Sequence, residues 1–230
     1  MVLTVKEAAA LLGATDRQIY RWVDQGEIPF YRVHDQVRFN RTDLLEWATS
    51  RRLPVSLEAF DADLDPEDRA PSLAQALRRG GVHHDVPAAD RETALRAAVN
   101  LTPMPAGVDR EFLIDVLIAR EHTSSTAIGA GIAIPHVRRP MVVAGSPTTV
   151  SVSYLEHEVP FGAPDLKPVG TMILIVSPTV RTHLQVLAHL ATALQDPGFR
   201  GALDRRAPLA ELALQADRLE GRAIPSGGKA

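Results

Sequence analysis

Apolar residues recur at helical spacing in the first dozen positions of the chain. Thr4 precedes this pattern, and Glu7 follows three positions later, which is the spacing of a capping box at a helix N-terminus. Gly13 follows the last apolar position, and glycine tolerates the left-handed backbone with which helices often end. The pattern therefore predicts a first short helix with one apolar face between Thr4 and Gly13.

A second helix is predicted over 17–25, where apolar residues again follow each other at spacings of three and four. Either Thr15 or Asp16 can cap its N-terminus, and Gly26 can end it. The outward face of this helix carries arginine and glutamine, whereas its inward face is apolar.

A hairpin and a third helix complete the first part of the chain. Residues 30–39 predict the hairpin, which turns at 34–36, and either Asn40 or Thr42 can open the helix. Six of the eleven aromatic residues lie in this part, as the core of so small a domain requires. We therefore assign residues 1–52 to a small, mostly α, winged helix-turn-helix domain.

The periodic pattern is interrupted over 53–71, where three prolines and six acidic residues occur. This composition predicts a linker, although part of it can dock on a neighbouring domain. Because so acidic and proline-rich a segment should pack loosely, we do not expect a rigid lever between the two halves of the chain.

Periodic structure returns after the linker, and we assign 72–222 to a second domain and 223–230 to a flexible tail. The elements that we expect are helices opening at Ser72, Asp90 and Asp109, strands over 82–86, 148–155 and 169–176, and an amphipathic helix over 180–194. This alternation predicts an α/β domain with a mixed sheet flanked by helices.

The composition narrows the chemistry. With 45% hydrophobic and 23% charged residues it is that of an ordinary soluble protein. There is no cysteine, which excludes disulfides, thiol nucleophiles and cysteine-based metal sites. No apolar run approaches membrane-spanning length, and no signal peptide is visible. We therefore expect a cytoplasmic protein without membrane insertion, cofactor or metal.

The net charge of −3 divides unevenly along the chain. Residues 1–52 contain eight basic and seven acidic residues, so this segment carries +1 and the remainder −4. Phosphate neutralisation supplies most of the non-specific affinity for DNA, so one such module would bind a duplex weakly alone. We therefore expect a homodimer, with two modules spaced to successive faces of the major groove.

The first 50 residues resemble the excisionase-like and MerR-like DNA-binding domains. The resemblance is carried by residues 4–13, 19–23, 26–29 and 37–39, which come in the order of that family. It implies DNA as a partner, with the second helix in the major groove. The residues that we expect at the DNA are Arg17 and Gln18 at base edges, Arg21 and Arg38 at phosphates, and Thr15. A module for protein contacts, with these arginines solvated, is the alternative interpretation.

The second domain carries a longer motif. Arg120-Glu121 and then the run from Ser125 to His136, which ends in Ile134-Pro135-His136, are followed by related stretches at 159–165, 168–169 and 183–188. This order resembles the enzyme IIA family of the bacterial phosphotransferase system, of the fructose, mannitol and nitrogen-regulatory type. One departure is Val137, where transport members commonly have glycine, and the Arg138-Arg139 rim that follows can alter which carrier docks.

The resemblance implies that His136 accepts a phosphoryl group from an HPr-type phosphocarrier and that His183 belongs to the same site. A largely unprotonated imidazole is a suitable nucleophile at neutral pH. Because phosphoryl transfer needs mainly positioning and donors for the phosphoryl oxygens, we expect Arg120 and Thr126 to bind phosphate. Pro135 would stiffen the backbone before the nucleophile.

Three functions remain open. The first, which we favour, is a transcription regulator controlled by phosphorylation of His136, so that the chain is a phosphotransfer protein acting mainly as a regulator. The second is a phosphotransfer subunit that passes phosphate to a separate sugar permease component. The third is an interaction protein whose His136 no longer accepts phosphate. For the first, we expect the two domains to be coupled by dimer geometry and not by a direct contact between phosphate and DNA.

Overall fold

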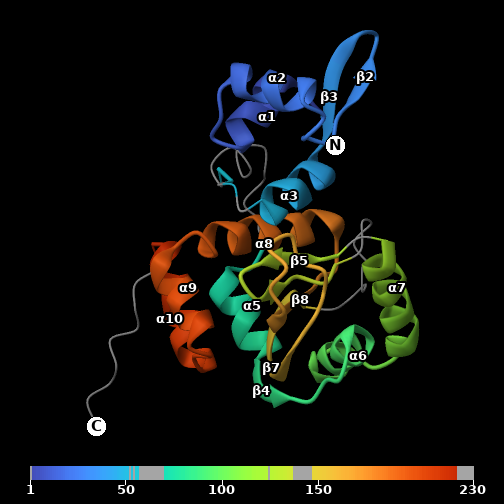
Figure 1. Cartoon of the computed structure of the whole chain (residues 1–230). Helices are drawn as coiled ribbons and strands as arrows, with labels where there is room; N and C mark the ends of the chain where they lie inside the picture. The colour runs from blue at the N-terminus through green and yellow to red at the C-terminus, as the bar shows by residue number, and fades with distance from the viewer. Residues whose placement is uncertain are drawn as a thin grey trace.

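The computed structural model describes residues 2–51, 53, 55–56, 70–123, 125–136 and 147–221, and places the N-terminal module above a larger C-terminal domain (Figure 1). The interior of the predicted linker, the predicted tail and the rim at Val137, Arg138 and Arg139 lie outside the described residues.

The N-terminal module has the predicted helices and hairpin. Its elements are β1 (Val2–Leu3), α1 (Val5–Leu11), α2 (Asp16–Asp24), β2 (Tyr31–Val33), β3 (Gln36–Asn40) and α3 (Arg41–Ser50). The strands form an antiparallel sheet in the order β1-β3-β2. Strand β1 was not expected, because two residues are too few to show alternation.

The caps explain where these elements begin. Thr4 and Glu7 form the predicted capping box. Thr15, not Asp16, caps α2, and Asn40, not Thr42, caps α3. The two choices that the sequence left open are thereby decided by which side chain accepts the backbone N–H of the first helical turn.

The C-terminal domain contains a five-stranded sheet between helices, which confirms the predicted α/β class. Its elements are α5 (Leu73–Gly80), β4 (Val82–Val86), α6 (Arg91–Leu101), α7 (Arg110–Thr123), β5 (Ala127–Gly129), β6 (Ile132–Ala133), β7 (Thr149–Val159), β8 (Val169–Val176), α8 (Val180–Ala193), α9 (Pro197–Asp204) and α10 (Leu209–Leu219). The strand order is β4-β7-β8-β6-β5. The β4–β7 and β6–β8 pairs are parallel and the β5–β6 and β7–β8 pairs antiparallel, so the sheet is mixed.

Two apolar cores lie on the two faces of this sheet. One includes residues of α6 and α7. The other includes residues of α5, α8, α9 and α10 and continues into the N-terminal module. Strand β8 is buried along its whole length, as the nearly all-apolar composition of 169–176 predicts.

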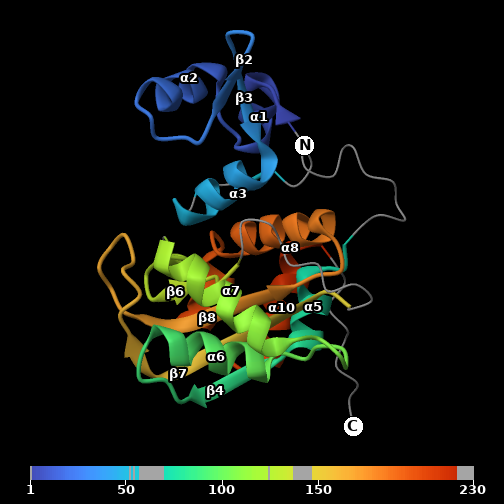
Figure 2. The same ribbon diagram turned by 90° about the vertical axis from the view of Figure 1, so that its right-hand side faces the viewer.

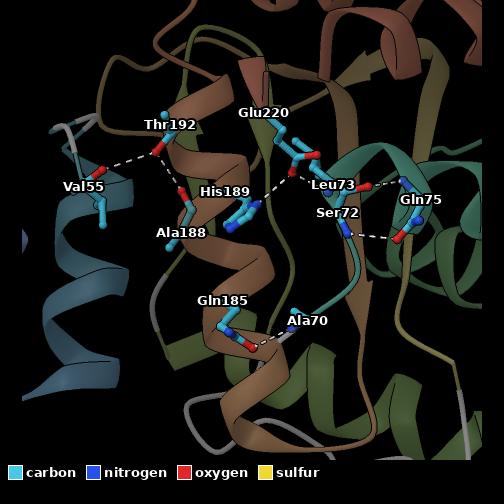
Figure 3. A network of polar contacts seen from close by, with 10 residues as sticks. All are labelled: Val55, Ala70, Ser72, Leu73, Gln75, Gln185, Ala188, His189, Thr192 and Glu220. Atoms are coloured by element: carbon cyan, nitrogen blue, oxygen red, sulfur yellow. Dashed lines mark hydrogen bonds and ion pairs between the residues drawn. The ribbon is translucent and has the colours of Figure 1, made fainter. Parts of the chain in front are cut away.

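Helix α3 joins the two parts of the chain, because it packs on α8 and β5 (Figure 2). Both ends of the predicted linker also contact α8. The hydroxyl of Thr192 donates to the carbonyl oxygen of Val55 at 3.4 Å, and Gln185 Oε1 accepts from the backbone N–H of Ala70 at 3.1 Å (Figure 3). The structure thus contains a direct contact between the domains, which the predicted loose linker did not lead us to expect. The contact forms because apolar residues on α3 and at the linker ends complete one common core.

No helix in the described ranges is long and apolar enough to cross a membrane.

Candidate phosphorylation site at the junction of the two domains

A cavity of about 590 Å³ lies where the N-terminal module meets the C-terminal domain. Its residues from the module are Gly26, Glu27, Ile28, Pro29, Asp43, Glu46, Trp47, Thr49 and Ser50. Its residues from the C-terminal domain are Arg120, Ser125, Thr126, Ala127, Ile128, Ile134, His136 and Leu187. Three of the four predicted phosphorylation-site residues, Arg120, Thr126 and His136, therefore line one cavity.

A tight hairpin brings His136 to this cavity. The turn between β5 and β6 is Gly129-Ala130-Gly131, whose φ angles of 82°, 50° and 77° are all in the left-handed region that favours glycine. Asp165 Oδ2 accepts from the backbone N–H of Ala130 at 2.6 Å and so ties the turn to a loop farther along the chain. The motif's glycines thus allow the backbone to make the tight turn between β5 and β6. Strand β6 then leads directly into Ile134, Pro135 and His136.

The imidazole of His136 is oriented by its own backbone. Its Nδ1 lies 2.6 Å from the carbonyl oxygen of Ile134. A carbonyl oxygen only accepts, so Nδ1 carries the hydrogen and donates it. In the neutral ring the lone pair is therefore on Nε2. The side chain is only 11% exposed, and Nε2 lies 3.5 Å from Glu46 Oε1, which is an ion pair when the imidazole is protonated.

His183 lies in the first turns of α8, which Thr179 caps through the backbone N–H of Thr182. It does not line the cavity, and it is only 5% exposed. Burial, together with the nearby charge of His136, lowers the pKa of His183 to about 4, while the charge of Glu46 acts in the opposite direction. His183 is thus a neutral imidazole at neutral pH. It lies close enough to His136 that a positive charge on one ring disfavours protonation of the other.

The hydroxyl of Thr126, which was predicted to bind phosphate, is occupied by a buried carboxylate. Its hydroxyl donates to Glu121 Oε2 at 2.5 Å, and its backbone N–H donates to the same oxygen at 3.0 Å. Glu121 is 3% exposed and lies in the last turn of α7, next to Arg120. The sequence placed Glu121 in the motif but gave no sign that its carboxylate is buried and holds Thr126.

Glu46 is the residue at this cavity that sequence reasoning missed. It lies on α3 of the other domain, and nothing in the local pattern of α3 relates it to a histidine in a distant motif. Only the packing of α3 on α8 and β5 brings its carboxylate to His136.

The predicted DNA-contacting residues of α2 lie together on its outer face. Arg17, Gln18 and Arg21 are exposed and line a shallow hollow of about 600 Å³ together with Thr15. Gln18 Oε1 accepts from the backbone N–H of Thr15 at 2.9 Å, so this side chain also closes the capping box. Arg38 lies apart from them on β3, where its guanidinium donates to the Val37 carbonyl and to Gln36.

The fold and the cavity define a helix-turn-helix module docked on an α/β domain, with a histidine just beyond the end of β6. The family model for enzyme IIA type 2 of the phosphoenolpyruvate-dependent sugar phosphotransferase system matches residues 75–213, and the chain belongs to that family. A helix-turn-helix domain model matches residues 2–52.

Regulatory proteins are among the relatives of this chain. A nitrogen regulatory protein of Pseudomonas aeruginosa is 34% identical over 148 residues, which are 62% of this chain and 92% of that protein. The transcriptional repressor DcmR of Methylorubrum extorquens is 42% identical over 86 residues, which are 36% of this chain and 32% of the repressor. The crystal structure of nitrogen regulatory protein IIA-Ntr from Neisseria meningitidis superposes with a TM-score of 0.53 at 26% identity, covering 63% of this chain and 98% of that one.

Proposed function

We propose that this chain is a DNA-binding transcription regulator whose activity is controlled by phosphorylation of His136. The observation that carries the proposal is the shared cavity, of which one wall is the helix-turn-helix module and the other holds His136. A chemical change at the histidine therefore acts directly on the module. Relatives that are named nitrogen regulatory proteins and a transcriptional repressor support a regulatory role.

The proposed reaction is transfer of a phosphoryl group from an HPr-type carrier to His136 Nε2. The lone pair of Nε2 forms the new N–P bond while the bond from phosphorus to the carrier breaks, and its electron pair remains with the carrier. Nδ1 keeps its hydrogen on the Ile134 carbonyl throughout. Arg120 and Thr126 are proposed to donate to the phosphoryl oxygens, which requires Thr126 to release Glu121.

His183 is proposed to support this reaction as a neutral donor. Its low pKa keeps it uncharged beside His136, so it adds no repulsion when that ring carries positive charge. At the other end of the chain, Thr15, Arg17, Gln18, Arg21 and Arg38 are proposed to contact DNA, and two copies to bind one operator in the cytoplasm.

Phosphotransfer is tested by incubating the full chain with phosphorylated HPr-type carriers and measuring its intact mass. We expect the mass gain of one phosphoryl group, its loss in His136→Ala, and its retention in His157→Ala, a histidine whose side chain is 82% exposed far along β7. A gain that persists in His136→Ala would refute the assignment.

DNA control is tested by selecting binding sequences for the phosphorylated and unphosphorylated chain at fixed salt. We expect one operator to be bound with different affinity by the two forms. If phosphate is accepted and passed on to a sugar permease component while DNA binding does not change, the chain is a phosphotransfer subunit. If no carrier phosphorylates a folded chain, the IIA domain acts in protein contacts only.

A further inference from the structure

The DNA-binding module is docked on the C-terminal domain through the buried face of α3. Leu44, Leu45 and Ala48 are each 0% exposed and belong to the same core as residues of α8. The contact continues at the linker end, where Val55 is 5% exposed against α8. This packing gives the module a defined position on the domain that holds His136.

The same helix directs an acidic side chain at the predicted nucleophile. Glu46 is 15% exposed in its side chain, and its Oε1 lies 3.5 Å from His136 Nε2. The nitrogen that carries the lone pair, and not the anchored Nδ1, is therefore the atom that faces the module.

We propose that the docked module is a latch closed over His136 and that phosphorylation of Nε2 opens it by displacing Glu46. The proposal rests on the proposed function for its natural trigger, and it adds the mechanism by which phosphate reaches the DNA-binding module. It replaces coupling through dimer geometry alone, because the contact lies within one chain.

Space at Nε2 supports the latch. A phosphoryl group adds a phosphorus atom and three oxygens at the atom that receives it. With a carboxylate oxygen only 3.5 Å from Nε2, that group cannot be accommodated while Glu46 keeps its place. The module therefore has to leave, or at least to withdraw α3, before the product can form.

Charge acts in the same direction. A phosphoryl group brings close to two negative charges at neutral pH, and like charges at contact distance disfavour each other. The module's wall of the cavity already carries Glu27, Asp43 and Glu46, whereas Arg120 belongs to the opposite wall. Opening removes these carboxylates and leaves Arg120 beside the phosphate.

The module should move as one body. Trp47 of α3 donates its indole N–H to the carbonyl oxygen of Glu27 at 2.6 Å, and its ring packs edge-on against Trp22 of α2 at 5.1 Å between centroids. Displacing α3 thus displaces α2 as well. Because the outer face of α2 is already exposed, opening changes the orientation and reach of this face and does not uncover it.

The latch can be tested without any carrier, by measuring a distance between spin labels. The chain has no cysteine, so Lys6→Cys on α1 and Asp115→Cys on α7, both at exposed positions, give two unique attachment sites. We expect one narrow distance distribution for the unphosphorylated full chain. His136→Glu places a carboxylate against Glu46 and should lower the ratio of closed to open molecules by about tenfold or more. His136→Gln has similar size without the charge and should stay closed.

A second substitution tests whether Glu46 is the contact. Glu46→Gln in the His136→Glu chain removes one of the two facing carboxylates and should restore the narrow distribution. Asp43→Asn is the matched control, because Asp43 lies one turn earlier on α3 and lines the same cavity. The chain with both His136→Glu and Asp43→Asn should therefore stay open. Equal rescue by the two neutral substitutions would refute a specific role of Glu46.

Phosphorylation of the spin-labelled chain in which His136 and Glu46 are unchanged gives a readout that does not depend on the folding of a variant at the latch. We expect the phosphorylated chain to show the long, broad distances of His136→Glu. A phosphorylated chain that stays narrow would overturn the latch while leaving the phosphotransfer proposal intact. If no carrier phosphorylates the chain but folded His136→Glu opens, the proposed function fails and the latch stands. A broad distribution in the unmodified chain would also refute the latch.

Discussion

The carboxylate of Glu121 accepts both polar hydrogens of Thr126, the backbone N–H at 3.0 Å and the hydroxyl at 2.5 Å. Both residues are buried, with Glu121 3% and Thr126 5% exposed. The pair joins the end of α7 to the loop before β5, and so it positions the cavity wall on which Arg120 and His136 lie.

Glu121→Gln should therefore destabilise the chain. The amide of glutamine has one acceptor oxygen, and its NH₂ group would replace a carboxylate oxygen that faces the backbone N–H of Thr126. Two donors would then face each other, and a buried polar group would be left without a hydrogen bond. We expect a loss of about 1–3 kcal/mol in the free energy of unfolding, measured with urea. Glu156→Gln changes an exposed carboxylate on β7 and should change stability by about 0.5 kcal/mol or less. Equal effects of the two substitutions would contradict this account of Glu121.

The phosphoryl group should be found on Nε2 of His136 and not on Nδ1. The Ile134 carbonyl holds the Nδ1 hydrogen at 2.6 Å, and phosphorylation there would break this bond. Nitrogen-15 NMR of the phosphorylated chain distinguishes the two isomers of phosphohistidine. A signal from the Nδ1 isomer would mean that the ring turns over before transfer, and the orientation argued from Ile134 would be wrong.

His183 should make stability depend on pH. Its pKa is lowered in the folded chain to about 4 from an ordinary value of 6.5, so between these values the unfolded chain binds more protons. Stability is then fully present above about pH 6.5 and is lost as the pH falls toward 4. A shift of this size corresponds to about 3 kcal/mol.

The pH effect is measured by urea unfolding at a series of pH values. We expect His183→Gln to flatten the curve between pH 4 and 6.5, since there is then no imidazole at position 183 to take up a proton on unfolding. His157→Gln, which changes an exposed imidazole, should leave the slope as it is. A slope that survives in His183→Gln would assign the effect to other groups.

Arg17 and Arg38 should contribute differently to DNA binding. Arg17 is exposed at the start of α2, where a recognition helix approaches base edges, so Arg17→Ala should relax base preference by about 1–3 kcal/mol at one position. Arg38 lies on the wing, and Arg38→Ala should weaken binding to all sequences alike and reduce the salt dependence. Binding assays on matched and mismatched duplexes at several salt concentrations separate the two effects. If both variants lose affinity uniformly, α2 does not read bases through Arg17.

The sequence by itself determined the local structure and the motifs. Capping boxes, helix-ending glycines and the apolar run over 169–176 act over a few residues, so their effect can be read without tertiary structure. The IIA motif likewise named His136, Arg120 and Thr126, and the structure brings all three to one cavity. Shorter elements such as β5 and β6 were missed, because two or three residues hold no period.

Only the tertiary structure decided how the two domains meet. The sequence predicted a loosely packed linker and no rigid lever between the domains, yet α3 packs on α8 and β5 and the linker ends contact α8. Glu46 reaches His136, and Glu121 holds Thr126, through packing of whole elements. Apolar periodicity shows which face of a helix is buried but not which partner covers it, because burial in any complementary core satisfies the same pattern.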